Sequence, residues 1–437
     1  MFGMKLLPHP RLVLELFERL SKNSDFWKSL RPEGPAFSRR RVYTLDVVIR
    51  LMILQWLLPG GTLREAVQHW LQSQAGSERE MSISPRAGAY CRARLKLPTL
   101  VVINVFELIV ERLRGWLPRH PLIPDRTVFV LDGSTLTLPH APDLLQAYPP
   151  SRNQYGDSHW PIIRLVVLQD VQTGLALRPH WGPHHGPHAV GEQELALAAI
   201  PQLPAHSVVL GDRNFGIFAV AWTAAQWQHD VLLRLTRPHA EALLGRPLTA
   251  PCERQVGWKP TRFDRCGGPF PEAAVVGGRL VCIAAEHSVD EKLLFFFTTL
   301  DLPADALGAL YRLRWNVEID LRSIKQTVRL QQLSSRSSEM LEKDLLLALA
   351  AYNLVRAVIC LAAEKANVEP RRISFTSVYT LVETFLPDIL TAHSKQQWTQ
   401  CWERIISIAT AYLLPNRTKP RSYPRAVWRR PTRHSRT

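Results

Sequence analysis

Cysteine is scarce in this chain: six of its 437 residues are cysteine, and no two of them form a Cys-x-x-Cys pair. They are scattered along the sequence as Cys91, Cys252, Cys266, Cys282, Cys360 and Cys401. This pattern argues against a dense disulfide framework and against a zinc site built from paired thiolates. We therefore expect reduced thiols, as in a cytoplasmic protein.

Long apolar runs are missing as well. Residues 1–10 hold no apolar stretch of the length that a secretory signal peptide needs, so we expect none. The longest apolar segment, residues 345–363, contains Asn353 and Arg356, which favours a buried helix over a membrane span. These features predict a cytoplasmic protein with no membrane partner.

Acidic residues are outnumbered: 38 Asp and Glu stand against 54 Lys and Arg, which gives a formal net charge of +16 at pH 7. Such an excess predicts a polyanionic partner, and charge alone leaves open DNA, RNA or an anionic membrane. A merely solvated basic surface is the alternative. Hydrophobic residues make up 46% of the chain, enough for substantial cores, and its length predicts two to four domains.

Residues 1–120 are predicted to form an all-α domain. Thr44 can cap a first helix, and Thr62 with Glu65 has the spacing of a capping box at the start of the next. A basic segment follows, and Pro98 opens a further helix. Helix, tight turn, helix and basic helix are compatible with DNA binding, and plain helical packing with basic solvent faces explains the order equally well.

Three segments concentrate positive charge and could bind phosphates. Residues 37–42 contain three consecutive arginines, and residues 86–96 carry four basic side chains. The Pro-rich tail from residue 416 is predicted to be a flexible arm that contacts DNA.

At Thr127 the pattern changes from helices to strands. Strands are predicted over residues 127–138, 162–170, 175–181, 207–212 and 231–235, with helices over residues 191–200 and 215–228. A three-stranded meander, a helix, a strand, a helix and a strand is the ribonuclease H-like order, a mixed α/β sheet.

Residues 236–292 are rich in Gly and Pro and are predicted to form a β-rich insertion, closed by a strand over residues 292–298. Helices are predicted to follow from Asp301 and over residues 342–364. The predicted organisation is a helical N-terminal DNA-binding domain (1–120), a catalytic domain in two parts (121–235 and 293–375), the insertion between them (236–292), and a C-terminal helical region with a basic tail (376–437).

Two acids stand on strands that this order makes neighbours. Asp132 lies partway along the first strand, and Asp212 lies at the end of the fourth. Acids at the ends of adjacent strands face the same crevice. A charged residue inside an apolar strand is costly unless it binds something, so the pair indicates a binding site.

A third acid falls within residues 311–325. On a helix with about 100° per residue, Tyr311, Arg314, Glu318 and Lys325 share one edge of an apolar stripe. One interpretation is an amphipathic helix with an Arg314–Glu318 ion pair. The other is a carboxylate placed among cations to hold a metal ion next to a phosphate.

With these residues placed, the chain resembles the DDE transposases of bacterial insertion sequences, specifically the insertion sequence 4 family. The resemblance covers about residues 37–363. It rests on four motifs: Asp132-Gly133-Ser134, Asp212-Arg213-Asn214-Phe215, the Tyr-x2-Arg-x3-Glu-x6-Lys spacing of Tyr311, Arg314, Glu318 and Lys325, and Tyr352-Asn353-Leu354-Val355-Arg356.

The resemblance implies a DNA transposase that binds the ends of an insertion sequence and catalyses metal-dependent strand cleavage and strand transfer. Asp132, Asp212 and Glu318 would be the catalytic residues and would hold two Mg²⁺ ions, with Mn²⁺ as a substitute, since oxygen ligands favour these ions. Tyr311, Arg314 and Lys325 would bind DNA phosphates. The implied partners are terminal inverted repeats, target DNA and a second copy of the chain in the bacterial cytosol.

Two alternatives remain at this point. A catalytically silent DNA-binding protein derived from a transposase is disfavoured because all three acids are present. A structure-specific nuclease with the same fold is disfavoured by the Tyr–Arg–Glu–Lys helix. If a hairpin intermediate is used, Trp258 and Trp315 are candidate platforms for a flipped base.

Other polar residues have simpler explanations. His180, His184, His185 and His188 could form a metal site, but a His-rich loop near DNA is favoured because no Cys or acid has ligand spacing with them. Asp170 and Glu192 could support the site; Glu192 is better explained as a charge that stabilises a helix N-terminus.

Overall fold

The computed structural model describes residues 42–58, 60–74, 83–118, 121–154, 156–262, 264, 270–285, 292–392 and 394–415. Residues 37–41 of the first basic segment and the basic tail from residue 416 lie outside the described residues. The predictions made for those two segments therefore stay predictions.

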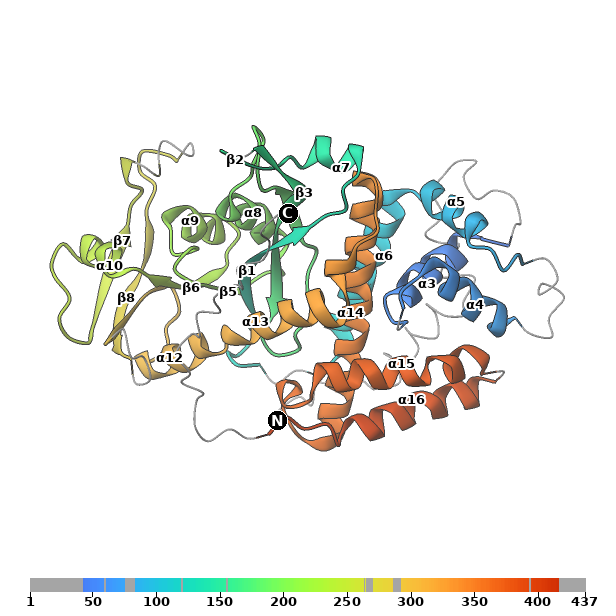
Figure 1. Cartoon of the computed structure of the whole chain (residues 1–437). Coiled ribbons are helices and arrows are strands. Elements are labelled where there is room, and N and C mark those ends of the chain that lie inside the picture. Colours follow the sequence, from blue (N-terminus) through green and yellow to red (C-terminus); the bar gives the residue numbers. More distant parts are fainter. Residues whose placement is uncertain are drawn as a thin grey trace, which may run out of the picture.

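A nine-stranded sheet forms the centre of the fold, in the order β2-β3-β1-β5-β6-β9-β8-β7, with β4 paired to β3 (Figure 1). Its strands are β1 (Val128–Thr137), β2 (Pro150–Asn153), β3 (Gly156–Asp170), β4 (His180–Pro183), β5 (Val208–Gly211), β6 (Asp230–Leu235), β7 (Cys252–Trp258), β8 (Val276–Ala284) and β9 (Leu293–Thr298). β5 runs parallel to β1 and β6, and the other pairings are antiparallel. The mixed α/β sheet is confirmed, and it fits the predicted ribonuclease H-like order.

The predicted neighbours β1 and β5 do pair. Val128, Val130 and Leu131 of β1 are buried, as are all four residues of β5, which explains why both segments read as apolar strands. Where they pair, over Val128–Val130 and Val208–Leu210, both strands are buried on both faces, as is typical of parallel strands.

The third strand begins later than predicted, at His180 instead of residue 175. Between the strands the chain turns at Gly174, whose φ of +75° suits glycine, and Ala176 makes one isolated bridge to Gln169. Side chains of a long helix, α14 (Ser338–Ala366), also bind this segment. Tyr352 donates to the Gly174 carbonyl at 2.9 Å, and the Asn353 amide donates to and accepts from the Ala176 backbone.

Strands β7 and β8 continue the sheet beyond β9, which pairs with β6. The residues predicted as an insertion thus supply the far edge of the same sheet, at the left of Figure 1. That residues 236–292 form a separate structural unit stays a prediction.

Helices occupy the rest of the described chain. They are α3 (Leu45–Gln55), α4 (Leu63–Ser73), α5 (Gly88–Lys96), α6 (Thr99–Trp116), α7 (Pro142–Ala147), α8 (Glu192–Ala199), α9 (Phe218–Gln226), α10 (Arg237–Leu244), α12 (Ala304–Arg312), α13 (Trp315–Arg322), α14, α15 (Phe375–Thr391) and α16 (Lys395–Ala409). α14 packs against α6 and α3 on one side and against α15 and α16 on another (Figure 1).

The helix caps differ from expectation in detail. Thr44 is the N-cap residue of α3 as predicted, but its hydroxyl makes no cap hydrogen bond and donates instead to the Asp46 carboxylate at 2.5 Å. Thr62 accepts from the Glu65 N–H as predicted, but the Glu65 carboxylate accepts from the Gly60 N–H. The capping box is therefore only half formed, because the glycine turn offers Glu65 a different donor.

The predicted core helix over residues 342–364 is confirmed within α14. By length and composition α14 could cross a membrane, with a mean hydropathy of 2.1 in its most apolar window, yet 94% of that window is buried inside the protein. Such burial is that of a core helix. Its polar residues Asn353 and Arg356 are buried with backbone carbonyl partners on the β3–β4 connection.

The helix predicted through residues 311–325 is not one regular α-helix. It is divided at Leu313–Arg314 and ends in a π-helical turn, η3 (Ser323–Thr327). Leu313 and Arg314 donate to carbonyls three residues back, whereas Val328 donates to Ser323, five residues back. The sequence-based projection, which assumed about 100° of rotation per residue, therefore misplaces side chains across the break at Leu313–Arg314 and across the π-helical turn.

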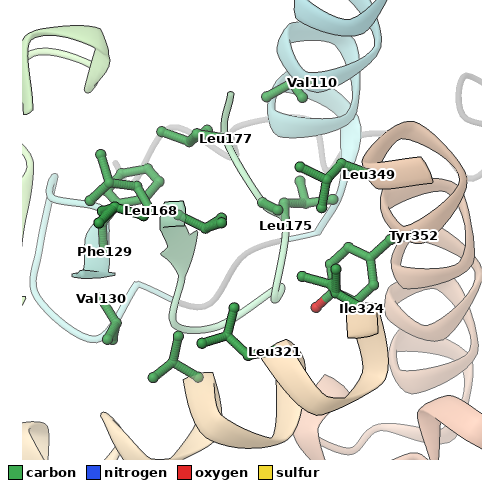
Figure 2. Close-up of a cluster of buried hydrophobic side chains, with 14 of the residues drawn as sticks. Val110, Phe129, Val130, Leu168, Leu175, Leu177, Leu321, Ile324, Leu349 and Tyr352 are labelled. Carbon is green, nitrogen blue, oxygen red and sulfur yellow. The ribbon is translucent and has the colours of Figure 1, made fainter. Parts of the chain in front are cut away.

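Packing explains the π-helical turn. Leu321 and Ile324 point into a buried cluster that also contains Val130 of β1, Leu168 of β3 and Tyr352 of α14 (Figure 2). The wider turn lets both apolar residues face the sheet, so the helix is held against β1 by burial.

Asn353→Ala tests whether the hydrogen bonds between α14 and the β3–β4 connection stabilise the fold. In Asn353→Ala the Ala176 N–H and carbonyl lose their partners in a buried site, so we expect the free energy of unfolding to fall by roughly 2–4 kcal/mol. Urea denaturation measures it. Gln400→Ala, on the exposed face of α16, is the control and should change stability by less than about 0.5 kcal/mol. Equal effects of both changes would contradict the assigned role of Asn353.

Candidate active site

Asp132 lies on β1 directly opposite Val167 of β3 and is half-buried. Its carboxylate accepts a hydrogen bond from the Gly133 N–H at 2.9 Å. Burial raises the pKa of Asp132 from its ordinary 3.8 to about 7; the Gly133 N–H and Arg314 oppose the shift, and Asp212 and Glu192 add to it. Asp132 is therefore an acid in a site with an excess of negative charge.

Asp212 follows the last residue of β5. In the β1–β5 pairing Val130 lies opposite Leu210, so Asp132 and Asp212 stand two residues further along, at the same level of the sheet. The Asp212 carboxylate accepts from the Asn214 N–H at 2.8 Å, which fixes its orientation at the end of the strand. The sequence prediction that these two acids lie together agrees with this register.

Glu318 lies on α13, which packs against β1, but its side chain is 46% exposed. Arg314 donates to the Glu318 carboxylate at 3.3 Å, the ion pair that the sequence offered as the alternative explanation. Within the described residues, no three His, Cys, Asp or Glu side chains are arranged to hold a metal ion. The third acid is thus near the site without completing it.

Arg314 occupies the centre of the charged groups. It is buried, with 8% exposure, and its guanidinium lies 4.9 Å from the centre of the Trp315 ring. Burial lowers the pKa of Arg314, but the surrounding groups outweigh that effect and raise it; they are Tyr311, Asp132, Asp212 and Glu318. One cation therefore stands among all three predicted acids.

The donor set suits a hard divalent cation. Carboxylate oxygens are the ligands that Mg²⁺ and Mn²⁺ prefer, and the three acids already stabilise one positive charge between them. The Glu318 side of the Arg314–Glu318 pair is open to solvent, with 46% of the side chain exposed, so its carboxylate has room to change rotamer.

Tyr311 and Lys325 have different surroundings. Tyr311 is buried against Phe296, with ring centroids 4.8 Å apart, and burial raises the pKa of its hydroxyl while Arg314 and Arg234 lower it. Lys325, in the π-helical turn, donates to the Ser134 hydroxyl at 3.1 Å, and burial lowers its pKa. Lys325 therefore lies beside the first acid motif, and Tyr311 lies in the core behind Arg314.

Glu192 is the residue that sequence reasoning undervalued. It is the first residue of α8, as expected for a helix N-terminal charge, but its carboxylate also lies over Gly133. Burial raises the pKa of Glu192, Asp212 adds to the rise, and Arg164 opposes it. The glycine after Asp132 was the available signal, because it leaves room for a neighbouring side chain.

The remaining candidates lie elsewhere. Trp258 is fully buried between Phe218 and Phe297, so it cannot serve as a base platform without unfolding, whereas Trp315 is 57% exposed. His184 and His185 contact each other edge to face, with ring centroids 4.4 Å apart. The Asp170 carboxylate accepts from the Gln172 and Thr173 N–H groups, which assigns it to the turn after β3.

A mixed sheet with two acids level on adjacent strands and a third acid on a packed helix is compatible with metal-dependent phosphoryl transfer. A model of the family described as "Transposase DDE domain" matches residues 123–354, and the chain belongs to this family. It is also similar to "Transposase InsG for insertion sequence element IS4" of Escherichia coli (strain K12), with 24% identity over 351 residues, 79% of this chain and 77% of the relative.

These comparisons confirm the predicted resemblance and the predicted class of enzyme. The protein is a DNA transposase, an enzyme that cleaves and transfers DNA strands, and divalent-metal dependence is general in the family. Neither comparison supports the alternative of a silent DNA-binding protein.

Asp132→Asn tests the electrostatics of the site without DNA. Because the folded protein raises the pKa of Asp132 from 3.8 to about 7, it binds that proton more tightly than the unfolded chain, and stability is lost as pH rises through this window. Asparagine keeps the acceptor for the Gly133 N–H and removes the charge. Without divalent metal, the variant should be more stable than the unchanged protein near pH 8 and equally stable near pH 4.

Chemical denaturation across that pH range measures the difference in free energy of unfolding. Asp305→Asn, an exposed acid in the first turn of α12, is the matched control and should give no such pH-dependent gain. A gain for Asp132→Asn that is independent of pH would show that burial of this charge is not its cause.

Proposed function

We propose that this transposase carries out cut-and-paste transposition of an insertion sequence, with Asp132, Asp212 and Glu318 as its catalytic residues. The observation that carries the proposal is the register of β1 and β5, which sets Asp132 level with Asp212 beside Arg314 and α13. The named relative is a transposase of an insertion sequence element, which supports the same assignment.

We further propose two Mg²⁺ ions as the cofactor, replaceable by Mn²⁺, which Asp132, Asp212 and Glu318 would hold together. Bound there, the ions would activate the attacking oxygen and stabilise the leaving oxygen of the DNA strand. The chain's own contribution is to hold the carboxylates at one level and to release Glu318 from Arg314.

Arg314 and Lys325 are proposed to bind the phosphates that flank the scissile bond. Arg314 would exchange the Glu318 carboxylate for a phosphate, for which its planar guanidinium is equally suited. Lys325 is held beside Ser134, in the same motif as Asp132, which supports this role. Tyr311 would support Arg314 from the core and reach a phosphate through its hydroxyl.

The wider organisation is proposed on the same basis. Three of the four basic residues around α5 are exposed, namely Arg86, Arg92 and Lys96, whereas Arg94 is buried in an ion pair with Asp344 at 2.7 Å. This supports a DNA-binding role for residues 1–120. A homodimer that holds two terminal inverted repeats, acting in the bacterial cytosol, completes the proposal, with residues 236–292 as insertion and 376–437 as C-terminal region.

Strand cleavage tests the catalytic assignment. With Mg²⁺ and DNA that carries the ends of the element, Asp132→Ala, Asp212→Ala and Glu318→Ala should each reduce cleavage more than about 100-fold, beyond the loss typical of residues that merely support metal ligands. Gel-shift assays should show that DNA binding survives. Asp305→Ala on α12 is the control and should cleave normally; cleavage that persists in any of the three variants would overturn the assignment.

Lys325→Met tests the phosphate contact. Loss of one phosphate contact should weaken binding of end DNA and reduce the slope of log affinity against log salt concentration by about 1. Fluorescence anisotropy over a salt series measures both. Lys365→Met, an exposed lysine in the last turn of α14, serves as control. An unchanged slope for Lys325→Met would remove this residue from the DNA-binding site.

A further inference from the structure

We infer that Glu192 is a fourth carboxylate of the active site and helps to bind the divalent cation together with Asp132 and Asp212. This inference rests on the proposed function, because it assumes that the acids bind metal. It assigns to Glu192 a role beyond that of a charge at the start of α8.

The first support is the contact with Gly133. A Cβ added at Gly133 would overlap the Glu192 carboxylate, so the side chain rests on the backbone of the residue that follows Asp132. Only glycine leaves this space on β1. The sequence Asp132-Gly133 therefore admits a second carboxylate next to the first.

The second support is a shared partner. The Asn214 side chain donates to the Glu192 carboxylate at 2.8 Å, while the Asn214 backbone N–H donates to the Asp212 carboxylate at 2.8 Å. The Gln193 side chain in turn donates to the Asn214 carbonyl at 2.7 Å. One residue thus sets the positions of two acids relative to each other.

The neighbouring Glu194 shows that a helix charge alone does not explain this placement. Both acids lie in the first turn of α8, where either stabilises the helix dipole. Glu194 is exposed and accepts from the Gly191 N–H, as a capping residue does. Glu192 instead turns toward Asp132 and Asp212, where like charges repel unless a cation lies between them.

The placement of Glu192 does not depend on the pairing of Glu318 with Arg314. Asp132, Asp212 and Glu192 come from the sheet and from α8; the described side chains are not arranged to hold an ion as they stand, so ion binding would draw these three carboxylates together. A hard cation takes six or more oxygen ligands, so an added carboxylate increases both charge and ligand number. Glu192 would therefore strengthen cation binding before Glu318 joins.

Binding of Mn²⁺ alone to the DNA-free protein is the direct test, measured by calorimetry and by electron paramagnetic resonance of the free ion. Glu192→Gln removes the charge but keeps an oxygen that accepts from the Asn214 side chain. We expect at least about 10-fold weaker binding of Mn²⁺. Glu194→Gln, in the same helical turn, should bind as the unchanged protein does.

A second variant tests the geometry. Gly133→Ala leaves every charge in place but pushes the Glu192 carboxylate off β1, so it should also weaken Mn²⁺ binding. Because both changes remove the same contact, the double variant Gly133→Ala/Glu192→Gln should lose little beyond either single one. Fully additive losses would contradict the contact as the cause.

The outcomes separate this inference from the proposed function. If Asp132→Ala and Asp212→Ala lose Mn²⁺ binding but Glu192→Gln binds normally, the role of Glu192 is overturned and the metal site stands. If none of the three variants changes binding, the proposed metal site itself fails. If Asn214→Ala weakens binding and Glu192→Gln does not, Glu192 acts only as a hydrogen-bond acceptor, which also overturns the inference.

Discussion

In the parallel pairing of β1 with β5, Val130 lies opposite Leu210, and everything that the site requires follows from that register. It brings Asp132 and Asp212 to one level, and it exposes the backbone of Gly133 to the start of α8. The apolar side chains of α13 and of the π-helical turn pack on β1. This packing brings Arg314 next to Asp132 and Asp212. A shift by one residue would turn Asp132 to the opposite face of the sheet.

The helices behind the sheet hold this arrangement by polar contacts as well as by burial. Arg371 donates to the Val171 and Asp170 carbonyls at the end of β3 and to the Asp320 carboxylate of α13, the last at 2.5 Å. Asp320 is buried on the side of α13 opposite the exposed Glu318. Helix α13 is therefore fixed to the sheet from behind, while Glu318 stays exposed on its opposite side.

Strand order and the positions of Asp132 and Asp212 could be predicted from sequence because burial makes the strands apolar and an acid within them conspicuous. The π-helical turn after α13 could not, because it depends on how Leu321 and Ile324 meet the sheet. Glu192 was missed for a similar reason: its contact with Gly133 joins residues far apart in sequence, and its place at a helix start has an adequate local explanation.

Helix α14 has a consequence for what can be expressed alone. The segment that matches the family ends at residue 354, within α14, and it omits α6 and α3, against which α14 is buried. A fragment cut at those limits would expose apolar residues of half a core helix to water. We therefore expect a stable fragment to need α3 and α6, which precede the matched residues, and the rest of α14, which follows them.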